Sequence, residues 1–259
     1  MLEQKHHATG DALCEYVRKE AGDTVLLAFS AGKDSVGTWL QLRRHFKTVV
    51  PYFFFQIPGI SFVEDALKYY EDFFGVGIHR FPSPDLYESM ENLLLQPPML
   101  VPFWSEARMY WNFTMAAAVD WLRAKHKAPN MLAGMGYRKT DSMRRNFSIT
   151  KHGSIYPHML KFYPVFDWND ARLVRELKGE GVKLAVDYRF LYRTFEGPRH
   201  AQLEAVRDNF PRDYERILRW YPLAPADAKR REFYEAEGLE AQYAPELDAL
   251  AAKAAEETE

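Results

Sequence analysis

The chain has 259 residues, of which 47% are hydrophobic and 27% charged, with a formal net charge of −2. This length supports a substantial core, and no apolar run approaches the roughly 18 residues of a membrane-spanning helix. The single cysteine, Cys14, excludes an internal disulfide framework, and residues 1–7 lack the apolar stretch of a secretory signal, so we expect a cytoplasmic protein with no membrane partner.

Strand-like and helix-like segments alternate along most of the chain. An opening helix is expected over residues 8–20. The strands that we expect after it are 24–29, 49–55, 77–81, 130–135 and 161–166, and the helices are 35–46, 61–74, 84–95, 105–127 and 169–179. This spacing is typical of βα units and predicts a doubly wound α/β fold, a Rossmann-like and mostly parallel five-stranded sheet with helices on both faces.

The strand signal stops near residue 199, and the following segments favour helices at 201–209, 212–220 and 226–238. The sequence therefore predicts two domains, an α/β domain over residues 1–198 and a helical C-terminal extension over 199–259. The acidic end, 232–259, is typical of a solvated helix or tail. The Pro- and aromatic-rich stretch 96–104 fits either a lid or a packed connector.

The most informative segment is the turn Ser-Ala-Gly-Lys-Asp-Ser at residues 30–35, which joins the first predicted strand to a helix. The first amides of a helix have no internal partners, and the helix dipole is positive there, so backbone alone can bind an anion. Gly32 permits a close backbone approach, Lys33 adds a positive charge, and Ser30 and Ser35 add hydroxyl donors. The turn therefore predicts a polyphosphate site.

This turn is not a GxxxxGK[ST] phosphate loop, because Asp34 rather than a hydroxyl residue follows Lys33. It resembles the SGGKDS-type loop of the adenine nucleotide α-hydrolase superfamily, which contains the PP-loop ATP pyrophosphatases and their sulfonucleotide relatives.

A second block begins directly after the strand predicted at 130–135. It reads Gly136-x-Arg138-x-x-x-Ser142-x-x-Arg145, and Lys161, Pro164 and an Asp-Trp pair at 167–168 follow. Arginine forks suit phosphate or sulfate oxygens. Together with the first turn, these blocks cover residues 24–180 and resemble the phosphoadenosine phosphosulfate (PAPS) reductase-like family.

The resemblance implies a set of roles. Lys33, Asp34, Arg138 and Arg145 would carry the catalysis, with Asp34 near a Mg²⁺ ion and the arginines holding the α-phosphate end or an acidic second substrate. The residues implied in nucleotide binding are Ser30, Ala31, Gly32, Ser35, Gly59, Gly136, Ser142 and Lys161.

Gly59 occupies the place of the family's Asp-Thr-Gly segment, but the Asp-Thr pair is missing here, so the resemblance does not define the substrate. From the residues themselves, Asp167 and Trp168 are expected to cap the helix that starts near Asn169 and to pack beneath the site. Residues 138–161 carry six Lys or Arg against Asp141 as the single acid, a charge that could neutralise a substrate.

The resemblance to thiol-dependent reductases fails at the cysteine that performs their chemistry, since no cysteine follows Cys14, for which we expect a structural role. The favoured reading is an ATP pyrophosphatase using ATP and Mg²⁺, which cleaves between the α and β phosphates to activate sulfate, a small molecule or a nucleic acid. Two alternatives stay open: a sulfonucleotide-binding or reductase-like protein whose thiol comes from a partner protein, and a non-catalytic nucleotide-binding subunit. The oligomeric state is also open, and a homo-oligomer is one of the alternatives.

Overall fold

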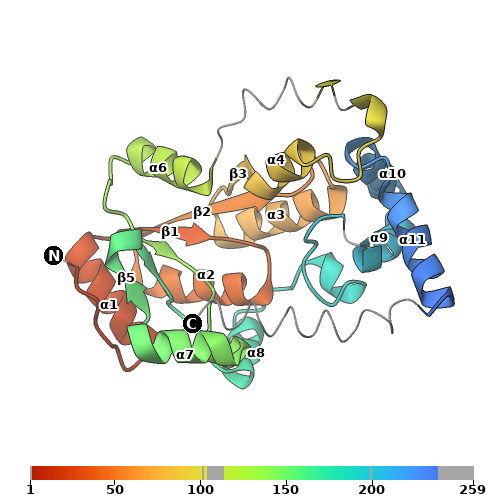
Figure 1. Cartoon of the computed structure of the whole chain (residues 1–259). Helices are drawn as coiled ribbons and strands as arrows, with labels where there is room; N and C mark the ends of the chain where they lie inside the picture. The colour runs from red at the N-terminus through yellow and green to blue at the C-terminus, as the bar shows by residue number, and fades with distance from the viewer. Residues whose placement is uncertain (1, 101, 104–113, 199, 239–259) are drawn as a thin grey trace. The chain divides into compact units, whose positions relative to one another are not determined.

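The computed structural model describes residues 2–100, 102–103, 114–198 and 200–238 (Figure 1). Its helices are α1 (Gly10–Ala21), α2 (Lys33–His45), α3 (Ser61–Phe74), α4 (Pro84–Glu91), α6 (Met115–Lys125), α7 (Met143–His152), α8 (Asp170–Gly179), α9 (His200–Asn209), α10 (Pro211–Trp220) and α11 (Ala224–Ala236). Its strands are β1 (Thr24–Ala28), β2 (Thr48–Phe55), β3 (His79–Pro82), β4 (Ala133–Gly134), β5 (Ile155–Tyr156) and β6 (Lys161–Phe162). Short 3₁₀ turns include η3 (Lys139–Asp141) and η5 (Val186–Arg189).

The strands form one sheet in the order β3-β2-β1-β4-β6-β5. Neighbours pair in parallel from β3 to β6, with Leu26 of β1 opposite Val50 of β2 and Ala133 of β4. The fold class is confirmed, since this is a mostly parallel α/β sheet of Rossmann-like type. The count of five strands was wrong, because β5 adds a sixth, antiparallel strand beside β6. Its two residues are too short for a periodic signal.

Both faces of the sheet are covered, which explains the continuously apolar sequence of β1. Val25 and Leu27 face one core, which receives side chains from α1, α2, α3, α7 and α8. Leu26 faces a second, smaller core, to which α6 contributes Leu122. Figure 1 shows α6 on one side of the strands and α1, α2 and α7 on the other. The sheet is therefore doubly wound.

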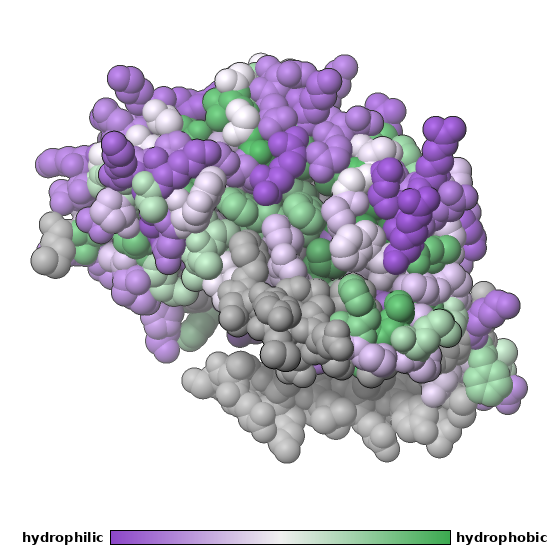
Figure 2. Space-filling view, turned by 90° about the horizontal axis from the view of Figure 1, so that it is seen from above, coloured by the Kyte–Doolittle hydropathy of each residue, from purple (hydrophilic) through white to green (hydrophobic). Residues whose placement is uncertain are grey.

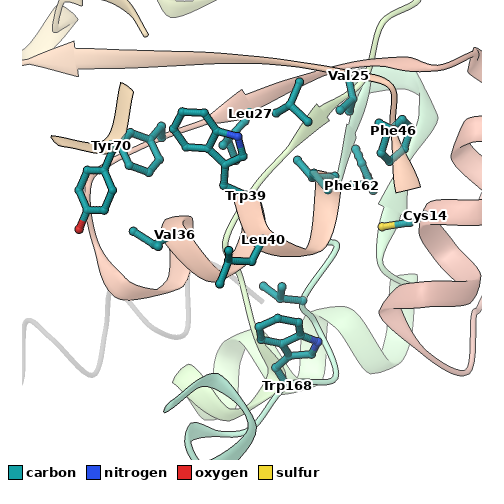
Figure 3. Packing of buried hydrophobic residues seen from close by; sticks show 14 of the residues in the cluster. Cys14, Val25, Leu27, Val36, Trp39, Leu40, Phe46, Tyr70, Phe162 and Trp168 are labelled. Atoms are coloured by element: carbon teal, nitrogen blue, oxygen red, sulfur yellow. The ribbon is translucent and has the colours of Figure 1, made fainter. Parts of the chain in front are cut away.

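The larger core fixes α2 against the sheet. Trp39 of α2 stacks on Phe74 with ring centroids 4.0 Å apart, and Phe29 meets the edge of Trp39 at 5.1 Å. Figure 3 shows Trp39 between α2 and the strands, whereas Trp168 lies on the side of α2 away from the strands. Gly37 makes this second contact close, because a Cβ there would lie 2.6 Å from Leu173 of α8. The position of α2 is thus set from two sides.

Several predicted boundaries shift. The helix expected at 84–95 ends at Glu91, and the strands expected at 130–135 and 161–166 are reduced to two residues each in β4 and β6. The helix expected at 105–127 is described from Met115 onward, and its earlier part lies outside the described residues. The three C-terminal helices are present as α9, α10 and α11, while most of the acidic end lies outside the described residues.

The chain separates into two compact units. The first comprises Met1–Glu88 and Tyr110–Gly197, and the second comprises Ser89–Met109 and Pro198–Glu259, so the boundary falls within α4. Inside the second unit, the side-chain amide of Gln96 donates to the Trp220 carbonyl at 2.7 Å, and the Leu223 amide donates to the Leu95 carbonyl at 3.0 Å. The beginning of the Pro-rich stretch therefore packs on the C-terminal helices.

The face seen in Figure 2 carries hydrophilic residues with smaller groups of hydrophobic residues between them. Among the described residues, no helix combines the length and the apolar character needed to cross a membrane.

Candidate functional site

The candidate site lies where β1 ends and α2 begins. In the strand order, β1 separates β2, which follows it in the chain, from β4, which comes much later. The strand order reverses at this point. Open α/β sheets bind ligands beyond the carboxyl ends of the strands at such a point. The loop from Phe29 to Gly32 occupies this point and leads into Lys33, the first residue of α2.

The loop is held in shape by Ser30, which lies within it, and Ser35, which lies in the first turn of α2. The Ser35 hydroxyl donates to the Gly32 carbonyl at 2.8 Å, and the Ser30 amide donates to the same hydroxyl at 3.2 Å. Ser35 is buried, so its hydroxyl bonds to the loop and not to solvent. The two hydroxyls lie 3.2 Å apart. In this geometry, the serines shape the loop whether or not they also contact a ligand.

The backbone of the loop is strained at Ala31 rather than at the glycine. Ala31 has φ 58°, a left-handed conformation that costs a non-glycine residue about 1 kcal/mol or more. Gly32 has φ −77°, which any residue adopts, but a Cβ there would lie 3.2 Å from the Ser30 hydroxyl and 3.4 Å from the Tyr188 hydroxyl. Gly32 therefore relieves crowding with two side-chain hydroxyls and is not needed for its backbone conformation, while its predicted close approach to a ligand stays a prediction.

The first turn of α2 offers unpaired amides. Among the described residues, no side chain caps this helix, and the amides of Asp34 and Ser35 have no acceptor there. The Lys33 amide donates to the hydroxyl of Tyr188, at 2.9 Å. Amide groups at a helix N-terminus carry partial positive charge, so this turn can receive the oxygens of an anion.

Arg138 is the centre of a charged cluster beside this turn. Its side chain is 3% exposed, and its three nitrogens lie 2.8 Å from Asp34, 2.9 Å from Asp141 and 3.0 Å from Asp170. Lys33 joins the cluster more loosely, with its ammonium 3.5 Å from Asp34 and 3.6 Å from Asp170. A buried guanidinium requires such partners, because an unpaired charge in the interior is strongly unfavourable.

Arg145 extends the cluster outward. It donates to Asp141 at 2.7 Å, and its guanidinium lies 4.2 Å from the centre of the Tyr137 ring. Its side chain is 42% exposed, so it is the more accessible of the two predicted arginines. The pKa of Asp170 is lowered chiefly by its hydrogen bond with Arg138 and also by Lys33, so this carboxylate stays ionised while the cations are near.

Gly136 explains how the second sequence block reaches the first. A Cβ at this position would lie 2.9 Å from the Asp34 carbonyl carbon and 3.1 Å from the Ser35 amide nitrogen. Backbone therefore passes directly over the first turn of α2, and this passage places Arg138 beside Asp34. The structure thus brings together the predicted residues Lys33, Asp34, Gly136, Arg138 and Arg145.

Three further predicted binding residues occupy a helix cap, a turn and a strand. Ser142 caps α7 and accepts from the Arg145 amide at 3.2 Å. Gly59 follows β2 in a turn with φ 72°. Lys161 begins β6 opposite Ala133 of β4 and makes no ion pair with the loop in the part of the chain that the structure describes.

The expectation for Asp167 and Trp168 needs correction. The helix near residue 169 is capped by Asn169 itself, which accepts from the Arg172 amide at 2.8 Å. Asp167 instead accepts from the Gly10 amide at the start of α1, at 3.0 Å, and from the Arg172 side chain. Trp168 is fully buried, in agreement with a packing role beneath the site.

Sequence reasoning missed Tyr188 and Asp170. Asp170 stands in the first turn of α8, where an acid is common, so its contact with Arg138 was hidden. Tyr188 lies in η5, which no periodic pattern marks. Of the six cations in residues 138–161, Arg138 and Arg145 are paired with carboxylates, two of which come from outside that segment. The free positive charge is therefore smaller than the local count indicated.

The structural role expected for Cys14 is confirmed. Its side chain is fully buried in the larger core (Figure 3), and burial raises the pKa of the thiol far above its ordinary value. A thiol in this environment is inert as a nucleophile.

Comparison with known proteins gives no family assignment, because no protein-family model and no curated protein matches the chain. Among solved structures, the chain is similar to the U34-tRNA thiolase NcsA from Methanococcus maripaludis with its 4Fe-4S cluster. The TM-score is 0.45, and the sequences are 14% identical over 86% of this chain and 83% of that chain. Nothing about function follows from a likeness of this extent.

Proposed function

We propose that the protein binds ATP at the first turn of α2 and cleaves it between the α and β phosphates, transferring the adenylyl group to an acceptor. The observation that carries this proposal is that the Ser-Ala-Gly-Lys-Asp-Ser segment joins a buried parallel strand to a helix whose Asp34 and Ser35 amides have no acceptor among the described residues. The Lys33 ammonium, 37% exposed and only loosely paired, is able to turn toward a bound phosphate.

The proposed reaction needs no nucleophile from the protein. An oxygen of the acceptor attacks the α-phosphorus, the bond from that phosphorus to the bridging oxygen of the β-phosphate breaks, and pyrophosphate leaves. The products are the adenylated acceptor and pyrophosphate, and any proton of the acceptor passes to water. The protein contributes positioning and charge stabilisation through the amides and Lys33. Arg145 lies at the more exposed end of the cluster, where it suits an acidic acceptor.

Asp34 fits the proposed role of a magnesium ligand. One of its carboxylate oxygens, Oδ1, faces Arg138 and Lys33, and the side chain is 30% exposed. Magnesium in nucleotide sites is commonly held by one or two carboxylates together with phosphate oxygens. When bound, it would neutralise charge on the pyrophosphate leaving group.

Arg138 acts in this proposal as a positioning residue rather than as a direct contact. Its guanidinium is buried and paired with three carboxylates. The contact with Asp34 is an ion pair at 2.8 Å without hydrogen-bond geometry, so Arg138 holds Asp34 beside the helix N-terminus by charge. The buried Cys14 argues against a reductase that uses its own thiolate. A sulfonucleotide ligand with a thiol from a partner stays an alternative.

The test is release of pyrophosphate from ATP and Mg²⁺, assayed with sulfate, small oxygen acids and RNA as acceptors. We expect Lys33→Ala to lower this release by about 100-fold or more, because the lysine stabilises charge that develops on the leaving group. Lys47→Ala is the matched control, since Lys47 is an exposed lysine just beyond the other end of α2.

The outcomes separate the alternatives. Equal activity of the two lysine variants and the wild type would refute the role of Lys33. Binding of ATP without turnover for any acceptor would favour a nucleotide-binding subunit, and failure to bind any adenine nucleotide would refute the proposal as a whole. Preference for a sulfonucleotide over ATP would favour the sulfonucleotide alternative.

A further inference from the structure

A folded segment, residues 185–197, covers the loop and is here named the covering segment. The Asp187 carboxylate, 4% exposed, accepts from the Phe195 amide at 3.1 Å and so closes the segment on itself. The Leu191 amide also donates to the Asp187 carbonyl, at 2.7 Å. These bonds give the segment a defined shape.

The covering segment is anchored at the start of α3. Phe190 and Phe195 both meet Phe62 edge to face, with ring centroids 5.6 and 5.7 Å apart. Gly197 lies against the side chain of Gln56, to which a Cβ would come within 3.8 Å. Aromatic packing of this kind holds the segment beyond the carboxyl end of β2.

From this anchored segment, the Tyr188 hydroxyl reaches the first turn of α2. It accepts the Lys33 amide proton at 2.9 Å, and a Cβ on Gly32 would lie 3.4 Å from its oxygen. In the part of the chain that the structure describes, the hydroxyl proton has no acceptor. The hydroxyl is therefore fixed by the bond that it accepts and still able to donate one.

The position of this donor is the informative point. The two amides that follow Lys33, those of Asp34 and Ser35, have no acceptor among the described residues, so an anion drawn to them lies next to the phenol. A hydroxyl that accepts from a helix N-terminus is polarised by the positive dipole and is a stronger donor. A phenylalanine would serve equally for packing, so packing does not explain a hydroxyl here.

We propose that the Tyr188 hydroxyl is a phosphate ligand of the site. It continues to accept the hydrogen bond from the Lys33 amide and donates a hydrogen bond to a phosphate oxygen, which the Asp34 and Ser35 amides also bind. The inference rests on the proposed function, because it assumes that the anion is the phosphate chain of a nucleotide.

The test uses Tyr188→Phe in the full chain, with Tyr192→Phe as the matched control. Tyr192 belongs to the same segment but is 85% exposed. Binding of Mg²⁺–ATP, inorganic pyrophosphate and adenosine is measured by calorimetry. Loss of a hydrogen bond to a charged group predicts affinities for ATP and pyrophosphate about 10 to 100-fold weaker in Tyr188→Phe. Adenosine affinity is expected to stay unchanged, thermal stability to fall only by the loss of the hydrogen bond from the Lys33 amide, and Tyr192→Phe to match the wild type throughout.

A second measurement uses the wild-type protein alone. On addition of pyrophosphate, the amide resonances of Asp34 and Ser35 are expected to shift strongly in an NMR spectrum, whereas that of Lys33 shifts little because the hydroxyl remains its acceptor. An equal shift of all three amides would mean that phosphate displaces the hydroxyl, which overturns the inference.

The failures are distinguishable. If Tyr188→Phe binds ATP as tightly as the wild type, or more tightly, the inference falls while the proposed function stands. If Tyr188→Phe weakens adenosine to the same extent as ATP, the residue supports the fold of the site and is not a phosphate ligand. If the wild type binds neither ATP nor pyrophosphate, both proposals fall.

Discussion

Two helices, α2 and α3, begin after neighbouring parallel strands of the sheet, and the N-cap residues Gly32 and Ile60 make no side-chain capping bond within the described residues. At α2, small residues lead into the helix, and Lys33 and Arg138 stand beside its first turn. At α3, the entry is apolar, with Ile60 and Phe62 both 1% exposed. The same local geometry is thus open to an anion at one helix and filled by hydrophobic side chains at the other.

The comparison shows that a helix N-terminus alone does not make a site. The dipole and the orphan amides are common to all helices, whereas the surroundings differ. The covering segment makes a different contact with each helix. The rings of Phe190 and Phe195 pack against α3, whereas the hydroxyl of Tyr188 accepts a hydrogen bond from α2. Three predictions test this contrast.

The largest effect is expected for Arg138→Gln. Removing a buried cation leaves Asp34, Asp141 and Asp170 close together without their shared partner, which should cost about 3 kcal/mol of unfolding free energy. The displaced Asp34 should also weaken Mg²⁺–ATP binding at least about tenfold. Urea unfolding and calorimetry measure the two effects.

Arg80→Gln provides the matched control at α3. Arg80 pairs with Glu64 in the first turn of α3 and with Glu71, but it is partly exposed, so its loss should cost about 1 kcal/mol or less. We expect no change in ATP affinity. The contrast between the two helices would be contradicted if both arginine variants lowered ATP affinity equally.

An intermediate effect is expected for Gly136→Ala. The added Cβ would meet the backbone of Asp34 and Ser35 at about 3 Å, and since backbone cannot turn away, the first turn of α2 has to shift. The expected cost is about 2 kcal/mol, with weaker binding of pyrophosphate. Gly179→Ala in α8 is the control, because a Cβ there meets nothing within 4 Å and the backbone is not left-handed. Equal stability of the two alanine variants would refute the close approach.

The sequence predicted most of the fold, because β1 is a continuous apolar run bounded by polar residues and helices such as α3 are long enough to carry a period. It also predicted the α2 turn, which is a local feature. It missed β5, whose two residues carry no period, and it could not pair Arg138 with Asp170, because these residues meet only through the packing of α8 beside α2. The two sequence motifs identified Lys33 and Arg138 separately. The contact of Tyr188 with α2 could not be predicted, because the segment that carries Tyr188 shows neither a motif nor a hydrophobic period.

The smallest effect is expected for Asp187→Asn, which tests the covering segment itself. Burial raises the pKa of Asp187 above the ordinary value of about 3.9, so the folded protein retains a proton that the unfolded chain releases. Stability contributed by Asp187 therefore falls as pH rises from about 4 through the raised pKa. Asparagine keeps an acceptor for the Phe195 amide but does not titrate, so the variant should lack this fall.

Urea unfolding of both proteins between pH 4 and pH 7 measures the effect as a difference, which cancels carboxylates whose pKa is lowered, such as Glu71 and Glu180. The stability of Asp187→Asn relative to the wild type should increase with pH over this range. The pKa values of Tyr70 and Tyr188 are raised mainly by burial and also by the charge of Asp187. Both phenols therefore stay neutral throughout this pH range. A difference that does not change with pH would mean that Asp187 is ionised at no cost, and that the closure of the covering segment does not depend on a buried carboxyl group.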